Sequence, residues 1–434
     1  MSNLALLGGK KQITHEHSSV FRWPIVNEAM EQAVLGVLRD GNMSGTDITR
    51  KFEEKYAEWH GVKYALGHNN GTAALQAAFW GVGVRRGDEI IAPAVTYWAT
   101  CLPALSLGAS VVFADIDAKT LCINPDDIEH RITERTKAIV VVHYMSYPAD
   151  MDRINAIARK HSLKVIEDAS HAHGALYKGK IVGSLGDAAG FSCMTGKSFA
   201  IGEGGMLTTN DKDIYESALM WGHYARQDKI ENEKYSGLTG LPWGGCKYRM
   251  HQMSAAVGLE QIKKYPAEIA EIDKAMNYFW DLLADIKGLD SHRPTEPGTT
   301  KGGWYAVRGL YKSEAFGGLS VKRFCDAVTA EGTLGFSPGC NNALNLHPLF
   351  YSIDVYGDNC PTNKAPKVIP GSLPVTEGIQ KCVFAVPWFK KFDRELIENY
   401  AAAVRKVVDH HEELLSGDTD KDFQPGWALT ARKK

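Results

Sequence analysis

Three groups of residues in this chain have the types and spacing that chemistry requires. The first is Asn70-Gly71-Thr72, which opens an alanine-rich stretch. The free N–H groups and the positive dipole end of a helix N-terminus suit a phosphate. Gly and Thr are also ordinary caps of a helix. The segment therefore predicts either a phosphate site or a plain helix start.

The second group follows an aliphatic run that ends in Glu167-Asp168. Ligands of open α/β sheets bind at the carboxyl ends of strands. A carboxylate here could hold a cationic ring nitrogen, or it could cap the next helix. His171 and His173 lie just beyond it, but no third ligand stands at a recognisable spacing from this pair. We therefore predict no metal site.

The third group is centred on Lys197, which lies in a glycine-dense loop between two apolar segments. Removal from water would lower the pKa of this lysine and make it a Schiff-base nucleophile. The GEGG segment at Gly202–Gly205 lacks the GK[ST] of a P-loop and precedes a strand pattern rather than a helix. It therefore gives no indication of a nucleoside triphosphate.

A sheet must position these residues. Short aliphatic runs alternate with helical stretches from residue 88 onward, a pattern typical of a parallel sheet covered by helices on both faces. Two further strands flank the loop that carries Lys197. We expect strands at 88–94, 109–116, 137–144, 163–169, 186–193 and 204–211.

The rest of the chain divides into an arm and a second domain. Residues 1–25 show no sustained period and predict an N-terminal arm, followed by a large domain at 26–265. Helical material at 252–286 leads to a smaller C-terminal α/β domain at 266–434. Its segment 335–373, rich in Gly, Pro and Asn, is long for a structureless loop, which indicates a functional role. This domain is expected to contain strands at 304–311 and 382–389 and helices at 320–332 and 394–415.

Composition restricts the class of protein. Hydrophobic residues make up 44% of the 434 residues and charged residues 23%, which excludes a disordered chain. The 49 basic and 51 acidic residues give a net charge of −2, so we expect no nucleic-acid partner. The eight cysteines form no CxxC pair, and there is neither a signal peptide nor an apolar stretch of membrane-spanning length. We expect a soluble cytoplasmic protein with reduced thiols and no membrane association.

Longer motifs carry a family resemblance. The order of a phosphate-type helix start, Asp168 at a strand end and Lys197 in a buried loop resembles that of fold type I enzymes that use pyridoxal 5′-phosphate. The amino-acid sequences of five motifs, from about residue 25 to beyond residue 265, are similar to those of the DegT/DnrJ/EryC1/StrS aminotransferase family. This resemblance implies an α/β fold with a large, mostly parallel seven-stranded sheet. The motifs are FEEKYAEWHGVKYALGHNNGTAAL, GDEIIAPAVTYWAT, VIEDASHAHGALYKGKIVGSLGDAAGFSCMTGK, GEGGMLTTND and YRMHQMSAAVGLEQ.

The resemblance also implies roles for single residues. Lys197 would form the internal aldimine with the cofactor and then move the proton during a ping-pong reaction. Asp168 would pair with the pyridine nitrogen and keep it protonated. Tyr97 matches the position whose aromatic ring stacks on the cofactor. The phosphate would be bound by Gly71, Thr72 and Ser192.

Two positions depart from the family's usual pattern. His171 stands where the family often has Gln, and it would contact the 3-hydroxyl or the face of the cofactor ring. Lys247 stands where the family often has Asn, which reaches the phosphate of the neighbouring subunit. A lysine could do the same as a point charge, or it could have only a surface role. The resemblance therefore implies a homodimer with shared active sites.

The substrate is less closely defined. Most family members aminate a keto group on a nucleotide-linked sugar, and a smaller branch aminates inososes and related cyclitols or free keto-sugars. Three segments favour that branch, with L-glutamine or L-glutamate as the implied donor. Related sugar dehydratases carry His in place of the lysine, so Lys197 favours transamination. A non-catalytic regulator is the remaining alternative, although no helix-turn-helix is appended. The three segments are LALLGGKKQ with the later WP, FGGLSVKRFCDAV and LNLHPLF.

Overall fold

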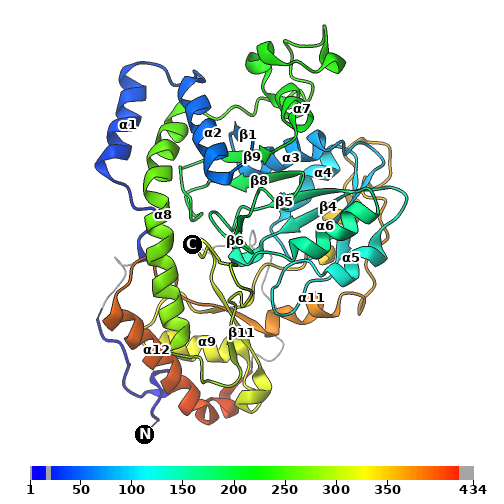
Figure 1. The fold of residues 1–434 in the computed structure, drawn as a ribbon. Helices are drawn as coiled ribbons and strands as arrows, with labels where there is room; N and C mark the ends of the chain where they lie inside the picture. Colours follow the sequence, from blue (N-terminus) through cyan, green and yellow to red (C-terminus); the bar gives the residue numbers. More distant parts are fainter. Residues whose placement is uncertain (1, 16–20, 420–434) are drawn as a thin grey trace.

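A mixed seven-stranded sheet forms the centre of the larger lobe in the computed structural model, which describes residues 2–15 and 21–419 (Figure 1). Six strands run parallel and only β9 runs against them. The predicted mostly parallel α/β fold is confirmed. Along the sheet the order is β1 (Tyr64–His68), β9 (Gly205–Thr209), β8 (Ala188–Ser192), β5 (Lys164–Asp168), β4 (Thr136–Val142), β2 (Glu89–Pro93) and β3 (Ser110–Ala114).

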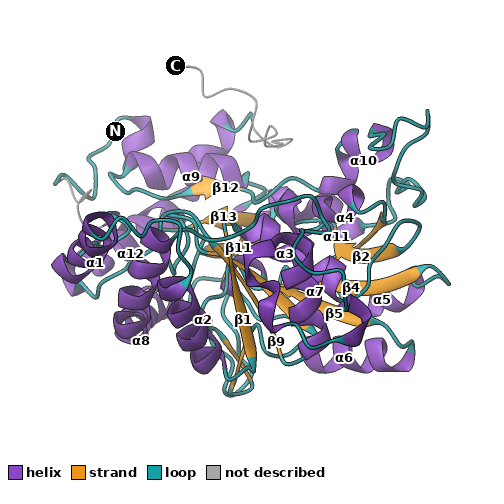
Figure 2. Ribbon diagram, turned by 90° about the horizontal axis from the view of Figure 1, so that it is seen from above, coloured by secondary structure: helices purple, strands orange, loops and turns teal. Residues whose placement is uncertain are grey.

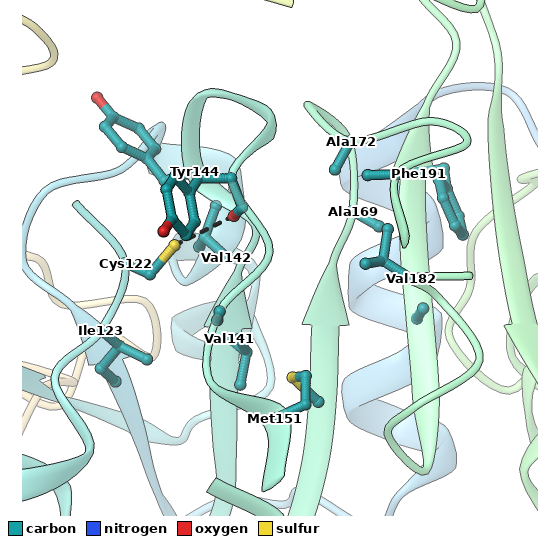
Figure 3. Close-up of a cluster of buried hydrophobic side chains, with 14 of the residues drawn as sticks. Cys122, Ile123, Val141, Val142, Tyr144, Met151, Ala169, Ala172, Val182 and Phe191 are labelled. Atoms are coloured by element: carbon teal, nitrogen blue, oxygen red, sulfur yellow. Dashed lines mark hydrogen bonds between the residues drawn. The ribbon is translucent and has the colours of Figure 1, made fainter. Parts of the chain in front are cut away.

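Helices cover both faces of this sheet, as Figure 2 shows. Successive strand side chains point to opposite faces, so Val140 packs under one helical layer and Val141 under the other. Figure 3 shows part of the core on the Val141 side of the sheet, which also contains Met151. The first layer contains α3 (Gly71–Gly81), α4 (Leu102–Ser106) and α7 (Lys212–Gly222), and the second contains α2 (Asp47–His60), α5 (Pro125–Arg131) and α6 (Met151–Lys160).

The long helix α8 (Gln252–Asp281) connects the two lobes (Figure 1). Tyr265 belongs to the core of the large sheet, whereas Met276 belongs to a separate core in the smaller lobe. The predicted bridging helix is thus confirmed. The helix α8 runs through residue 265 without a break. The predicted boundary between the domains 26–265 and 266–434 therefore has no visible counterpart in the helix and stays a prediction.

The smaller lobe is built on a four-stranded antiparallel sheet with the order β10-β11-β13-β12. Its core includes residues of α9 and α12 and two residues of the arm, Leu4 and Ile13. Residues 16–20 of the predicted arm and 420–434 of the predicted small domain lie outside the described residues. The elements are β10 (Leu289–Ser291), β11 (Arg308–Tyr311), β12 (Ser337–Pro338), β13 (Val383–Ala385), α9 (Val321–Ala330) and α12 (Arg394–Asp409).

The remaining short elements complete the described chain. Within it, no helix combines the length and the apolar character needed to cross a membrane. The segment 335–373 contains short elements but no extended secondary structure. Besides short 3-10 turns, the remaining α-helices and strands are α1 (Glu28–Arg39), α10 (Leu349–Ser352), α11 (Pro374–Gly378), β6 (Leu176–Tyr177) and β7 (Lys180–Ile181).

Candidate active site

Lys197 lies in the loop between β8 and β9 and is only 8% exposed. The loop is held on both sides of this residue, because the N–H of Lys197 donates to Met194 and its carbonyl accepts from the indole of Trp23 at 2.8 Å. The ammonium nitrogen lies 4.4 Å from the centre of the Tyr305 ring. The chain therefore presents one buried amine, on a fixed backbone, against an aromatic face.

The surroundings of this amine set its charge. Burial lowers the pKa of Lys197 from 10.5 to about 8, and the nearby Asp168 carboxylate opposes part of that effect. Burial also raises the pKa of the neighbouring Cys193 thiol, which keeps it neutral. A lysine with a pKa near 8 has a substantial neutral fraction at ordinary pH, as a nucleophile or general base requires.

Asp168 ends β5, at the carboxyl edge of the parallel strands. Its Oδ2 accepts a 2.6 Å hydrogen bond from the hydroxyl of Thr100, and its Oδ1 accepts one from the Ser170 N–H. The adjacent Glu167 has a different role, since it accepts from His143 and from three backbone N–H groups at residues 183–186. Of the two acids at this strand end, Asp168 is the one whose charge acts on Lys197.

The start of α3 lies against the end of β8. Asn70 is the cap of this helix, since its side chain accepts from the Ala73 N–H at 2.8 Å. The N–H groups of Gly71 and Thr72 have no acceptor among the described residues. A Cβ on Gly71 would stand 2.7 Å from that of Ser192, so only glycine allows this approach. The helix cap and a phosphate site can therefore coexist, because the cap uses the side chain of Asn70 and a phosphate would use the N–H groups of Gly71 and Thr72.

The two histidines beyond Asp168 lie in different surroundings. The ring of His173 lies between the Tyr56 hydroxyl and the Ser192 carbonyl, and burial lowers its pKa to about 3. His171 lies 4.8 Å from Tyr305, and burial, together with the charge of Lys197, holds its pKa well below 6.5. In the described part of the chain, no group of three or more His, Cys, Asp or Glu residues could hold a metal ion.

Two segments with unusual backbone conformations lie next to His171 and Tyr305. Met145, Ser146, Trp304 and Ala306 all have left-handed φ values, between 50° and 67°, although none is glycine. Such conformations persist only where the surrounding structure enforces them, and they cluster at functional sites. The hydroxyl of Ser146 ties the two segments together by donating to the carbonyls of His171 and Tyr305. The left-handed residues precede the strand, so β11 begins at Arg308 rather than at the expected residue 304.

The structure thus brings most of the candidate residues together and leaves Lys247 apart. Tyr97 follows β2, is 49% exposed and lies next to Trp98. It is close enough to Tyr305 to contribute to the raised pKa of that ring. Lys247 is exposed in the segment between α7 and α8. Sequence reasoning assigned no role to Thr100, Tyr305 or Trp23, which reach Asp168 and Lys197 from distant segments. Thr100 and Trp23 lie within segments that the family resemblance had singled out, but no local pattern shows what they contact.

Comparison with known proteins agrees with this arrangement. Residues 24–405 match the DegT/DnrJ/EryC1/StrS aminotransferase family. The L-glutamine:scyllo-inosose aminotransferase of Streptomyces griseus is 34% identical over 95% of this chain and 99% of its own length. The GDP-perosamine synthase of Caulobacter vibrioides is 38% identical over 63% of this chain and 70% of its own. The crystal structure of an aminotransferase from Psychrobacter cryohalolentis aligns with a TM-score of 0.76 at 28% identity, covering 90% of this chain and 99% of that one.

The chain therefore belongs to the DegT/DnrJ/EryC1/StrS aminotransferase family, is an aminotransferase, and has pyridoxal 5′-phosphate as its cofactor. The residues present fit this group. A buried amine lies beside a carboxylate, and two free helix N–H groups adjoin the end of the strand that carries Ser192. These are the donors and charges that an aldehyde, a ring nitrogen and a phosphate need.

Proposed function

We propose that this chain transfers an amino group from L-glutamine or L-glutamate to a keto group of a cyclitol of the inosose type or of a related keto-sugar. The observation that carries the proposal is the buried Lys197 amine, held near Asp168 with a pKa of about 8. The similarity to an L-glutamine:scyllo-inosose aminotransferase over nearly the whole of both chains supports this choice of donor and acceptor.

Lys197, Asp168 and the phosphate-binding residues would each have a separate role in this reaction. When bound, pyridoxal phosphate supplies a carbon that carries the amino group and a ring that accepts electrons. Lys197 would hold the cofactor and then move the proton at the reacting carbon. Asp168, fixed by Thr100, would keep the ring nitrogen protonated. The phosphate would lie on Gly71, Thr72 and Ser192.

The second subunit of a homodimer would complete the site. The segment between α7 and α8, which projects from the top of the molecule in Figure 1, carries four exposed apolar side chains and Lys247. Apolar surface of this kind marks protein interfaces, so we propose that Lys247 contacts the cofactor phosphate of the partner subunit. Tyr97 would stack on the cofactor ring, and His171 would contact it. The four apolar residues are Tyr224, Leu238, Leu241 and Trp243.

An aminotransferase for nucleotide-linked keto-sugars is the second candidate, and the similarity to GDP-perosamine synthase favours it. A dehydratase and a regulator are less well supported, because Lys197 and Asp168 are both present. A location in the cytoplasm and the absence of nucleic-acid partners stay predictions from composition.

The test is the absorption spectrum of the purified holoenzyme before and after addition of L-glutamine. We expect the visible band of the bound cofactor to disappear with glutamine and to return when scyllo-inosose is added. The Lys197→Ala variant should show neither change. A band that ignores both glutamine and glutamate would refute the proposal, and a return only with a nucleotide-linked keto-sugar would establish the second candidate.

A further inference from the structure

His223 is a buried histidine whose ring has no hydrogen-bond partner. It directly follows α7, is only 2% exposed, and neither Nδ1 nor Nε2 has a partner among the described residues. The last carbonyls of this helix do not serve the ring, because those of Met220, Trp221 and Gly222 accept from backbone N–H groups at residues 243–248. Leaving buried polar atoms unpaired is unfavourable, so a ring with two such nitrogens indicates a bound water or ion.

A cavity beside this ring has room for one small particle. Its volume is about 10 Å³, close to the least that a water-sized particle needs. Besides His223, the residues that line it include Arg226, Lys247 and Arg249. The Nε of Arg226 is also buried and has no partner in the described part of the chain. Two interior side chains with unpaired nitrogens therefore lie at one cavity.

The charges around this cavity are not balanced. Glu53 already holds Arg226 through two 2.6 Å hydrogen bonds, and Asp228, the next acid along the chain, is exposed to solvent. The side chain of Arg249 has no acidic partner among the described residues. Burial, together with the charges of Arg226 and Arg249, holds the pKa of His223 well below 6.5, so the ring is neutral. The cavity therefore has cationic walls and no described carboxylate to offset Arg249.

One wall of the cavity is joined to the start of α3. Arg249 pairs with His68 in an isolated β-bridge, and the Asn69 N–H donates to the Tyr248 carbonyl at 2.8 Å. Asn70, the cap of α3, follows directly in the chain. A particle that binds Arg249 would therefore steady the backbone that leads into the two free N–H groups of this helix.

We propose that the cavity between His223, Arg226 and Arg249 binds a monovalent inorganic anion, with chloride as the occupant. The N–H groups of His223 and Arg226 would donate to it, and the charge of Arg249 would balance it. Chloride is only slightly larger than water, and the exposed side chain of Lys247 on the cavity wall can give way. Phosphate, with four oxygens around phosphorus, needs more space, and water carries no charge to offset the arginine. The inference goes beyond the proposed function, since it involves neither the donor nor the acceptor.

The first test replaces chloride by gluconate at constant ionic strength, because gluconate is too large for the cavity. A chloride titration of the holoenzyme should raise the melting temperature in a saturable manner, by about 2–5 °C, as for a ligand that binds only the folded state. At saturating chloride the cofactor should leave about fivefold more slowly. Cofactor release is measured as loss of the visible band in the presence of a trap for free pyridoxal phosphate.

Crystals of the holoenzyme grown in bromide locate the site directly. Bromide replaces chloride and scatters anomalously, so we expect an anomalous peak in the cavity, in contact with the ring of His223 and the Nε of Arg226. The peak must accompany the saturable effect in solution. A peak without that effect would be an adventitious ion only, bound at crystal concentration, and would overturn the proposal.

Variants of the cavity residues assign the effect to this site. His223→Phe keeps a flat ring without nitrogens, so it should lose both chloride effects and melt in gluconate no lower than wild type. Arg249→Gln should raise the chloride Kd about tenfold or more, and Arg249→Lys should recover part of the affinity. The matched control is His60→Phe, at another buried histidine with an unpartnered Nε2, and it should keep the chloride effects within about twofold.

Several outcomes would overturn the inference. A melting temperature that ignores chloride, together with an empty anomalous map, would show that water fills the cavity. A carboxylate of a partner subunit in the cavity would also exclude the anion. Retained chloride effects in His223→Phe would place the anion elsewhere, and if that variant does not fold, equal chloride affinity in Arg249→Gln and wild type would lead to the same conclusion.

Discussion

The titration of Lys197 provides a direct test of the site's electrostatics. In protein freed of cofactor, the amine should lose its proton around pH 8 instead of 10.5. Lowering the pKa of a lysine favours its neutral form, so the neutral fraction must rise with pH and reach one half near pH 8. At pH 7 about one tenth of Lys197 would be neutral. This is about 300-fold more than for a lysine of ordinary pKa.

Only the neutral amine reacts with an acylating reagent, so brief labelling at a series of pH values measures this curve. Mass spectrometry of the peptide containing Lys197 gives the extent of labelling, and a free peptide with one lysine gives the reference. Loading with pyridoxal phosphate should abolish labelling at Lys197. Lys390, whose pKa burial also lowers to about 8, should remain reactive.

The variant Asp168→Asn tests whether the charge of Asp168 acts on the pKa of Lys197. The carboxylate of Asp168 raises the pKa of Lys197, so its loss should move the midpoint below that of wild type. A wild-type midpoint near 10.5 would show that water solvates the amine and would refute the argument from burial. A midpoint unaltered by Asp168→Asn would show that the two charges do not interact, and would remove the electrostatic link on which the site assignment depends.

Two further substitutions test the geometry around this lysine. Gly71→Ala would place a Cβ 2.7 Å from that of Ser192 and 2.8 Å from its Cα; we expect a loss of about 1–3 kcal/mol in the free energy of unfolding, measured with urea, together with weaker cofactor retention. An unchanged urea midpoint would mean that the helix start can move away. Thr100→Val keeps the side-chain shape but removes the buried hydrogen bonds to Asp168 and Thr96; turnover should fall by about tenfold and the melting temperature by only about 2–4 °C, and full activity would show that the bond to Asp168 does not position the carboxylate.

Sequence patterns predicted the parts of the site that depend on local order. Asp168 and Ser192 end strands whose aliphatic runs are evident, and Lys197 lies in the loop between two such strands. The carboxyl ends of parallel strands meet at one edge, so position along the chain was sufficient to bring these residues together. Glu167 shows the limit of this reasoning, because nothing in the sequence distinguishes its structural role from that of Asp168.

Contacts from distant segments could not be predicted in this way. Tyr305 lies against Lys197 in a segment where both of its neighbours, Trp304 and Ala306, adopt left-handed conformations. The sequence WYAVRGLY instead favours one continuous strand, as β-propensity dictates. Tertiary contacts, such as the hydrogen bonds of Ser146, enforce the turn, and no local pattern contains them. Trp23 contacts the carbonyl of Lys197 from 174 residues away for the same reason.

His171 shows how the structure accounts for a departure from the family's pattern. Its Nδ1 accepts a hydrogen bond from the buried Met145 N–H at 3.4 Å. In a neutral ring the proton then lies on Nε2, which becomes a donor. Burial and the charges of Lys197 and Arg308 keep the ring neutral, since they hold its pKa well below 6.5. A neutral N–H donor at the end of a planar side chain is also what Gln supplies, so the two residues can serve one chemical role without adding charge to a site that already contains two cations.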